Sequence, residues 1–214
     1  MCGRYAASWE PTKFHETFGV QPPLFESYNV APTSNAPVIR ELEGRREVTL
    51  ARWNLLPKWV RTPADYTART FNARSETLRE KASFERPFRS QRCLVPVSGY
   101  YEWGVEKQPY YVHSGGGELL ALAGLWDHWE GHGQQITSFA VITTEPGDKM
   151  KALHHRMPAI LSPENYEAWL SPESQVDELE SLLRPFGNLM YHPVARKVGR
   201  VRENDPRLTE PINL

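Results

Sequence analysis

The cysteine at position 2 could do the most specific chemistry in this sequence. Cys2 follows the initiator methionine, and methionine aminopeptidase removes that methionine when the next residue is small. The mature chain would then begin with a 1,2-aminothiol, whose amine and thiol have reference pKa values of about 7.7–8.0 and about 8.5. A neutral amine and some thiolate therefore coexist near neutral pH without any tuning by the fold.

Such a group supports two reactions. In one, the amine acts as a base and the thiolate attacks an acyl centre. In the other, the amine condenses with an aldehyde to an imine, and the thiolate closes the imine to a five-membered thiazolidine. Cys93 cannot close that ring because its nitrogen belongs to a peptide bond. Position alone leaves open that Cys2 is an ordinary cysteine with no chemical role.

Four short segments hold further polar side chains that could serve such a reaction. They are residues 28–32 with Asn29, residues 71–76 with Asn72 and Arg74, residues 97–103 with Glu102, and residues 153–158 with His154, His155 and Arg156. Taken one at a time, each has an ordinary structural explanation. Asn72 could cap a helix, Glu102 or Arg74 could form an ion pair, and a histidine could lie in the core.

Together with further motifs these segments form a specific combination, in the order MCGRY, YNVAP, RW with a following LLPKW, NARSET, RCLVPVSGYYEW, HHRMPAIL and HPVARKVG. The chain resembles the SOS response-associated peptidase (SRAP) family from residue 2 to about residue 200. The resemblance implies a covalent trap for abasic sites in single-stranded DNA. The N-terminal cysteine would form a thiazolidine with the ring-opened deoxyribose aldehyde and shield the lesion. It also implies self-removal of Met1 and a short bacterial form.

The resemblance assigns catalytic roles by motif position. Cys2 would be the nucleophile, and Asn72 would orient the sugar or the N-terminus. Glu102 would be the general acid and base, and His154 would assist ring opening. The adjacent His155 leaves the choice of histidine ambiguous. The resemblance implies no cofactor.

The resemblance also assigns residues to the DNA strand. Phosphates would be bound by Arg4, Arg74 and Arg156, and the strand would be held further by Asn29 and Trp53. The charge pattern agrees, because residues 40–92 carry 13 Lys and Arg against 7 Asp and Glu. Cations alternate with aromatic residues there, as in Lys58-Trp59, which is typical of a groove for single-stranded nucleic acid. A solvated basic face with tryptophans in the core is the other explanation.

The composition excludes several other classes. The formal net charge is −1, and the two cysteines cannot form a disulfide framework, which favours a reduced, intracellular protein. We find no CxxC or HExxH pattern and therefore predict no metal site. No apolar run is long enough to span a membrane, and no signal-peptide core is present. We expect a cytoplasmic monomer that associates with the nucleoid when bound to DNA.

The elements that would position these residues are mostly strands. The sequence predicts an α+β fold, with a mainly antiparallel, barrel-like β core, flanking short helices, and one domain over residues 1–214 with a polar tail from about 200. Runs of β-branched and aromatic residues predict strands at 37–42, 47–55, 93–103, 109–113, 119–126, 136–143, 158–161 and 189–194. Helices are expected near residue 11, capped by Ser8, and at 146–153, 163–170 and 172–183.

Two other functions remain as alternatives. An N-terminal-nucleophile amidohydrolase, such as a class II glutamine amidotransferase domain, also begins Met-Cys-Gly. That class continues with an apolar residue and glycine, where this chain has Arg4 and Tyr5. A non-catalytic module that binds single-stranded DNA would explain the basic segment but would leave Cys2 and Glu102 without a role.

Overall fold

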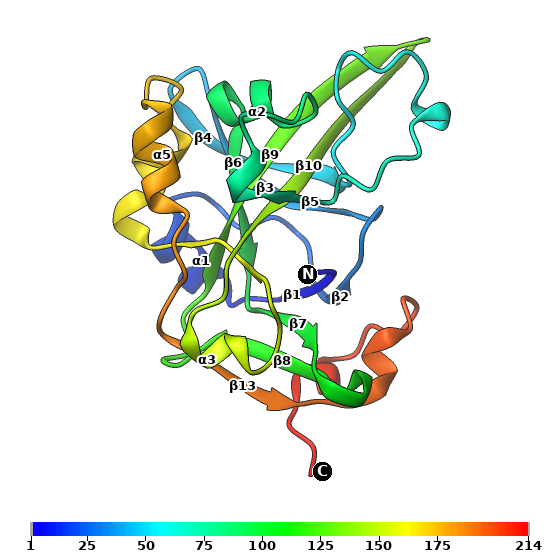
Figure 1. Ribbon diagram of the computed structural model, residues 1–214, viewed down its shortest axis with the longest axis vertical. Helices are drawn as coiled ribbons and strands as arrows, with labels where there is room; N and C mark the ends of the chain where they lie inside the picture. The colour runs from blue at the N-terminus through cyan, green and yellow to red at the C-terminus, as the bar shows by residue number, and fades with distance from the viewer. Residues whose placement is uncertain (1, 214) are drawn as a thin grey trace.

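The computed structural model describes residues 2–213, and its centre is a closed barrel of strands (Figure 1). Around the barrel, in order of pairing, run β10 (Gln134–Thr144), β4 (Arg45–Trp53), β3 (Asn35–Leu42), β6 (Arg92–Val97) and β9 (Leu120–Gly131). Strand β9 pairs again with β10 and closes the ring. Every pair is antiparallel except β10 with β4. The predicted α+β class with a barrel-like antiparallel core is confirmed.

Three short strands extend the barrel at its edges. Strand β5 (Asn72–Arg74) runs parallel to β10, and β11 (Met157–Pro158) pairs with the end of β10. Strand β12 (Ile160–Leu161) pairs with β9. Thr143 of β10 pairs with Arg74 on one edge and with Pro158 on the other, so β5 and β11 bring the segments around Asn72 and His154 to the same end of β10.

A second, antiparallel sheet lies beside the barrel (Figure 1). Its order is β13 (Leu189–Pro193), β8 (Pro109–Ser114), β7 (Gly99–Trp103), β1 (Arg4–Ala7) and β2 (Ser27–Val30). The expectation of one strand over residues 93–103 was wrong. The chain leaves the barrel at Ser98, whose backbone N–H donates to the carbonyl of Ala6 at 2.9 Å.

A glycine makes this change of sheet possible. A Cβ on Gly99 would lie 2.6 Å from the carbonyl oxygen of Val112 and 2.5 Å from the Tyr111 ring, so only glycine fits against β8. Strand β7 then continues to Glu102, which therefore belongs to the second sheet. The two sheets meet where β1 and β7 pass the barrel.

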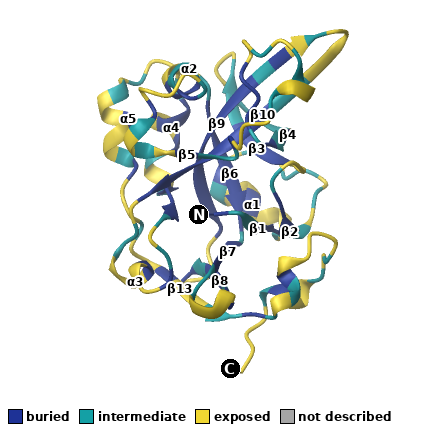
Figure 2. Cartoon of the chain, turned by 45° about the vertical axis from the view of Figure 1, so that its right-hand side comes forward, coloured by how far each residue is buried: buried dark blue, intermediate teal, exposed yellow. Residues whose placement is uncertain are grey.

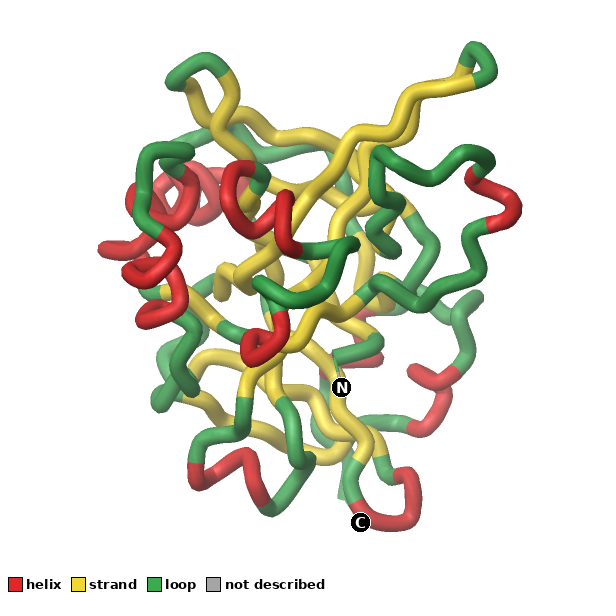
Figure 3. Tube along the Cα trace, turned by 45° about the horizontal axis from the view of Figure 1, so that its top comes forward, coloured by secondary structure: helices red, strands yellow, loops and turns green. Residues whose placement is uncertain are grey.

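The helices are short and lie around the outside of the strands (Figure 3). They are α1 (Pro11–Phe18), α2 (Glu85–Ser90), α3 (Asp148–Lys151), α4 (Tyr166–Leu170) and α5 (Val176–Leu182). Helix α1 buries Phe14 and Phe18, but its cap is Glu10, whose carboxylate accepts from two backbone N–H groups. The expected cap, Ser8, instead donates to Glu26 at 2.9 Å.

Burial follows the strands, and the exposed residues gather in the loops and the β9–β10 hairpin tip (Figure 2). The expected polar tail from about residue 200 is only partly correct, because Leu208 is fully buried in a 3₁₀ helix, Pro206–Thr209. Among residues 2–213, no helix has the length and apolar character needed to cross a bilayer.

Candidate active site

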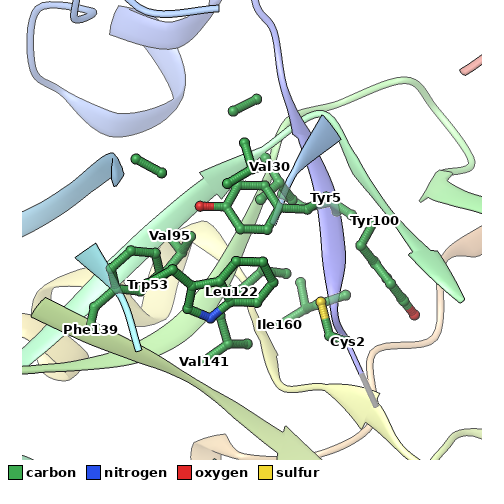
Figure 4. Close-up of a cluster of buried hydrophobic side chains, with 14 of the residues drawn as sticks. Cys2, Tyr5, Val30, Trp53, Val95, Tyr100, Leu122, Phe139, Val141 and Ile160 are labelled. Carbon is green, nitrogen blue, oxygen red and sulfur yellow. The ribbon is translucent and has the colours of Figure 1, made fainter. Parts of the chain in front are cut away.

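Cys2 lies two residues before the start of β1 and is fully buried. Figure 4 shows its sulfur among the side chains of a hydrophobic cluster that includes Tyr5, Trp53 and Tyr100. Burial, and secondly the negative charge of Glu102, raise the pKa of the Cys2 thiol well above its ordinary value. The sulfur is therefore protonated at neutral pH and needs a proton acceptor before it can attack.

Asn72 ties the N-terminal residue to the barrel. It opens β5, where it pairs with Val141 of β10, and its Nδ2 donates to the carbonyl oxygen of Cys2 at 2.8 Å. Within residues 2–213 the buried Oδ1 of Asn72 has no hydrogen-bond partner. Because a buried amide oxygen without a donor is costly, this atom is suited to accept from a group that binds beside Cys2.

Glu102 reaches the same place from the second sheet. Side chains alternate along β7, as the sequence predicted. Tyr101 and Trp103 lie in the hydrophobic cluster that contains Val198, and Tyr100 lies in the one that contains Cys2. The Glu102 side chain is on the Tyr100 face and only 3% of the residue is exposed. Burial raises the pKa of its carboxyl group. Such a carboxyl is suited to hold a proton at a pH where an exposed one would not.

His154 is the histidine that faces Glu102. Its Nε2 lies 3.8 Å from Glu102 Oε1, whereas His155 is exposed and stacks on the His154 ring at 4.1 Å between centroids. His154 Nδ1 lies 3.0 Å from the backbone N of Arg156 and 3.1 Å from its carbonyl oxygen, and these contacts fix the orientation of the ring. Burial lowers the pKa of His154 and favours its neutral form.

The four predicted catalytic residues thus come together from four separate segments. Cys2 precedes β1, Asn72 opens β5, Glu102 lies on β7, and His154 follows α3. We call these four residues the Cys2 cluster. It lies where the barrel and the second sheet meet, and it pairs a buried thiol with a carboxyl and an imidazole that can exchange protons. Among residues 2–213, no group of three or more metal-binding side chains is present.

The predicted phosphate-binding arginines differ in how much of their charge is available. Arg74 is exposed, and none of the ion pairs within residues 2–213 involves it. Arg156 makes a two-pronged ion pair with Glu76, at 2.7 and 2.9 Å, and donates to the carbonyl of Thr143. A phosphate at Arg156 would therefore compete with Glu76, whereas one at Arg74 would meet an unpaired cation.

Arg4 and Asn29 bind the C-terminal segment of the chain. Arg4 donates to Asn29 Oδ1 and to the carbonyl of Val198, both at 2.8 Å. Asn29 is only 5% exposed, and its Nδ2 faces the carbonyls of Val198, Arg200 and Glu203. The prediction that Asn29 holds the DNA strand needs correction, because its side chain is occupied inside the protein.

Trp53 needs the same correction. It is fully buried, packs on Tyr5 at 4.9 Å between ring centroids, and donates its indole N–H to the carbonyl of Phe71. No face of its ring is open to a base. Trp59, six residues later, is 58% exposed and lies edge-to-face with Tyr66. Both tryptophans follow a cation in the sequence, so that pattern did not distinguish the buried ring from the exposed one.

Sequence reasoning missed two tyrosines beside the Cys2 cluster. The hydroxyls of Tyr5 and Tyr100 are buried and, within residues 2–213, have no hydrogen-bond partner. Burial is the main cause of the raised pKa of Tyr100, and the charges of Cys2 and Glu102 add to it, which places the phenol close to both. Only the pairing of β1 with β7 brings these rings together, and no sequence motif signals it.

The sequence is similar to one family model and to several known proteins. The family model described as "SOS response associated peptidase (SRAP)" matches residues 1–201. The chain is 34% identical to the abasic site processing protein YoqW of Bacillus subtilis, covering 98% of this chain and 99% of that one. It is also 34% identical to the abasic site processing protein HMCES of Xenopus tropicalis, covering 88% of this chain and 67% of the relative.

The fold comparison agrees. A crystal structure of a protein from Bacteroides thetaiotaomicron superposes with a TM-score of 0.90 at 30% identity, and the match covers 99% of this chain and 100% of that one. A second, from Bordetella bronchiseptica, superposes with a TM-score of 0.81 at 25% identity, over 91% of this chain and all of the other. The arrangement of barrel and second sheet is thus shared with solved proteins.

Proposed function

Since the chain belongs to the SOS response-associated peptidase family, we propose that it processes abasic sites in DNA by trapping them covalently on Cys2. Relatives named as abasic site processing proteins support the general activity. The observation that carries the mechanism is the Cys2 cluster itself. Asn72 binds the backbone of Cys2, while Glu102 and His154 lie 3.8 Å apart beside it.

The proposed reaction joins three groups and releases one water molecule. After loss of Met1, the neutral amine of Cys2 adds to the C1 aldehyde of the ring-opened deoxyribose. The carbinolamine takes up a proton from a nearby acid and loses water to give an iminium ion, and the sulfur then attacks the same carbon. The thiol proton passes to a nearby base, and the product is a thiazolidine with a secondary amine. Met1 lies outside the described residues, and we propose that its removal precedes trapping.

Glu102 and His154 would move the protons. As an acid, Glu102 can protonate the sugar ring oxygen while the aldehyde forms, and as a carboxylate it can take a proton from the Cys2 ammonium. The raised pKa of Glu102 suits the first task, and the neutral His154 beside it can relay the proton. Burial keeps the Cys2 sulfur protonated, so the amine reacts first and the thiol closes the ring afterwards.

The DNA strand would be held outside this cluster. Arg74 lies two residues from Asn72 and has no ion pair among residues 2–213, and Trp59 offers an exposed ring for base stacking. We propose that one copy of the chain acts on single-stranded DNA that carries an abasic site. Because that substrate is chromosomal, the protein would act at the nucleoid.

A denaturing gel tests the proposal. The protein is incubated with a single-stranded oligonucleotide that carries one abasic site, and we expect a heat-stable shifted band. The matched control is Cys93→Ala, which removes the other buried cysteine and should leave the band unchanged. Cys2→Ser and Cys2→Ala should form at most a reversible imine through the amine. A heat-stable adduct from Cys2→Ala without a reductant would falsify the thiazolidine.

The same assay separates the alternatives. Glutamine hydrolysis without a shifted band would indicate an amidotransferase. Salt-sensitive retention of DNA on native gels, with no band on denaturing gels, would indicate a binding module. Either result would overturn the covalent mechanism.

A further inference from the structure

A basic segment near the C-terminus has no role in the mechanism above. Residues 196–202 read RKVGRVR, with four cations and no acid, and we call them the basic segment. Arg196, Arg200 and Arg202 are exposed, and Lys197 is half-buried. No ion pair within residues 2–213 involves any of the four. Their charge is therefore available to a partner.

The backbone under these cations is held firmly. Arg4 donates to the carbonyls of Val198 at 2.8 Å and Gly199 at 3.2 Å. The buried amide of Asn29 donates to the carbonyls of Arg200 at 3.0 Å and Glu203 at 2.8 Å. Val198 is itself fully buried in the cluster that contains Tyr101. The cations thus lie on an ordered backbone, which lowers the entropic cost of binding a ligand.

This anchoring connects the basic segment to the reaction site. Arg4, which binds the segment, stands two residues after Cys2. In Figure 1 the segment, in orange to red, lies beyond β2, where Arg4 of β1 and Asn29 of β2 bind its backbone. A strand whose lesion reaches Cys2 would therefore bring its neighbouring phosphates within reach of these side chains.

The charge pattern of the chain also singles the segment out. Outside residues 40–92 the chain has 12 Lys and Arg against 19 Asp and Glu, and four of those 12 cations lie in these seven residues. Three of the four are arginines, which bind phosphate through two parallel hydrogen bonds.

We propose that the basic segment binds the DNA backbone on one side of the lesion, as a second phosphate contact separate from Arg74. The inference rests on the proposed function for the identity of the ligand. It gives Arg4 and Asn29 a structural role, because both side chains hold the segment in place. The side chains of Arg196, Arg200 and Arg202 make the contacts.

Salt dependence of binding tests the proposal. The variant is Arg196→Gln/Arg200→Gln/Arg202→Gln, and its matched control is Lys13→Gln/Lys107→Gln/Arg184→Gln, three exposed cations outside both basic stretches of the chain. Affinity for an undamaged single strand is measured by anisotropy between 50 and 200 mM salt. Each lost contact flattens the logarithmic slope by about 0.7, so three flatten it by about 2. The affinity ratio of wild type to variant should shrink roughly 20-fold over that range.

A second experiment locates the phosphate contact relative to the abasic site. Cross-linking rates at subsaturating DNA are compared for oligonucleotides shortened on the 5′ or the 3′ side of the abasic site. Shortening one side should remove the difference between variant and wild type, while shortening the other should preserve it. A difference that survives both truncations would overturn the contact, as would an unchanged salt slope. The variant Arg196→Lys/Arg200→Lys/Arg202→Lys should keep the wild-type slope, and melting temperatures confirm that each variant is folded.

These outcomes are separate from the test of the proposed function. If wild type forms no covalent adduct, the trapping mechanism fails, yet the salt slope still decides whether the segment binds DNA. If wild type forms the adduct and the glutamine variant retains the full slope, only the second contact is wrong.

Discussion

The Cys2 cluster and the cationic surface outside it differ in burial, charge and hydrogen bonding. In the cluster, Cys2 and Glu102 are at most 3% exposed, and burial raises the pKa of each, which favours the neutral, protonated form. Outside it, Arg74 and the arginines of the basic segment are exposed and have no ion pair within residues 2–213.

The proposed function would require this difference of the two regions. An aldehyde is uncharged and small, so the cluster would gain little affinity from it and would serve to position groups and move protons. A DNA backbone is a regular anion, and exposed cations bind it with an energy that salt weakens. Substitutions in the cluster should therefore change rates and pH dependence, and substitutions on the surface should change affinity and its salt dependence.

Blocking the N-terminus should have the largest effect. An uncleavable tag before Cys2 turns the reactive amine into an amide, so cross-linking should be abolished while affinity for single-stranded DNA stays largely intact. Denaturing gels and anisotropy measure the two quantities. Mass spectrometry of the active protein should show that Met1 has been lost. Full-rate cross-linking by protein that retains Met1 would show that the amine has no role.

Glu102→Gln should slow cross-linking by about 100- to 10,000-fold, the usual contribution of a positioned acid and base, and should slow reversal equally. DNA affinity should not change. Single-turnover rates measure the effect. A wild-type rate with a lowered melting temperature would instead assign Glu102 to a structural ion pair.

Stability against pH gives the same substitution a second readout. Burial raises the folded-state pKa of Glu102, so its stabilising contribution is present below its unfolded pKa and lost as pH rises through the folded value. At neutral pH, Glu102→Gln should therefore not lower the melting temperature. Glu76 is the control, because its hydrogen bond with Arg156 lowers its pKa. Glu76→Gln should destabilise the protein at neutral pH, and less so in acid.

Trp53 and Trp59 test the same comparison with one buried and one exposed side chain. Trp59→Ala should weaken binding of single-stranded DNA by about 1–3 kcal/mol, the usual value of one stacked base, with little change in melting temperature. Trp53→Ala should lower the free energy of unfolding by about 3–5 kcal/mol, because a large buried side chain is removed. Anisotropy and urea titration measure both variants. Equal effects on binding from the two substitutions would contradict the assignment of Trp53 to the core.

The tryptophans also show what the sequence could and could not predict. Strands were predictable because β-branched and aromatic residues alternate along them, as in β9 and β10. The burial of individual residues could not be predicted, since it depends on partners that are far away in the sequence. Asn29 is buried against carbonyls 169 to 174 positions away. The break at Ser98 was missed because residues 93–103 are apolar and aromatic on both sides of it.

The Cys2 cluster was predictable only through the family resemblance. Cys2 and Asn72 are 70 positions apart, and no periodicity relates them. The closure of the barrel and the pairing of β1 with β7 bring these residues together. The resemblance correctly named the residues that meet, but it also included Asn29 and Trp53, whose place in the motifs reflects the fold.

Arg74→Ala should have the smallest effect and the most specific signature. Arg74 has no ion pair within residues 2–213, so its removal should cost one phosphate contact and flatten the salt dependence of binding by about 0.7. At saturating DNA the cross-linking rate should stay near that of wild type, because the guanidinium touches no reacting atom. Arg79→Ala is the matched control, since Arg79 is already paired with Asp177 and Glu180 and should leave the slope unchanged. Arg74→Lys should restore the slope, because a point charge still displaces one counterion. A slower rate at saturating DNA with an unchanged slope would move Arg74 from the surface into the chemistry of the Cys2 cluster.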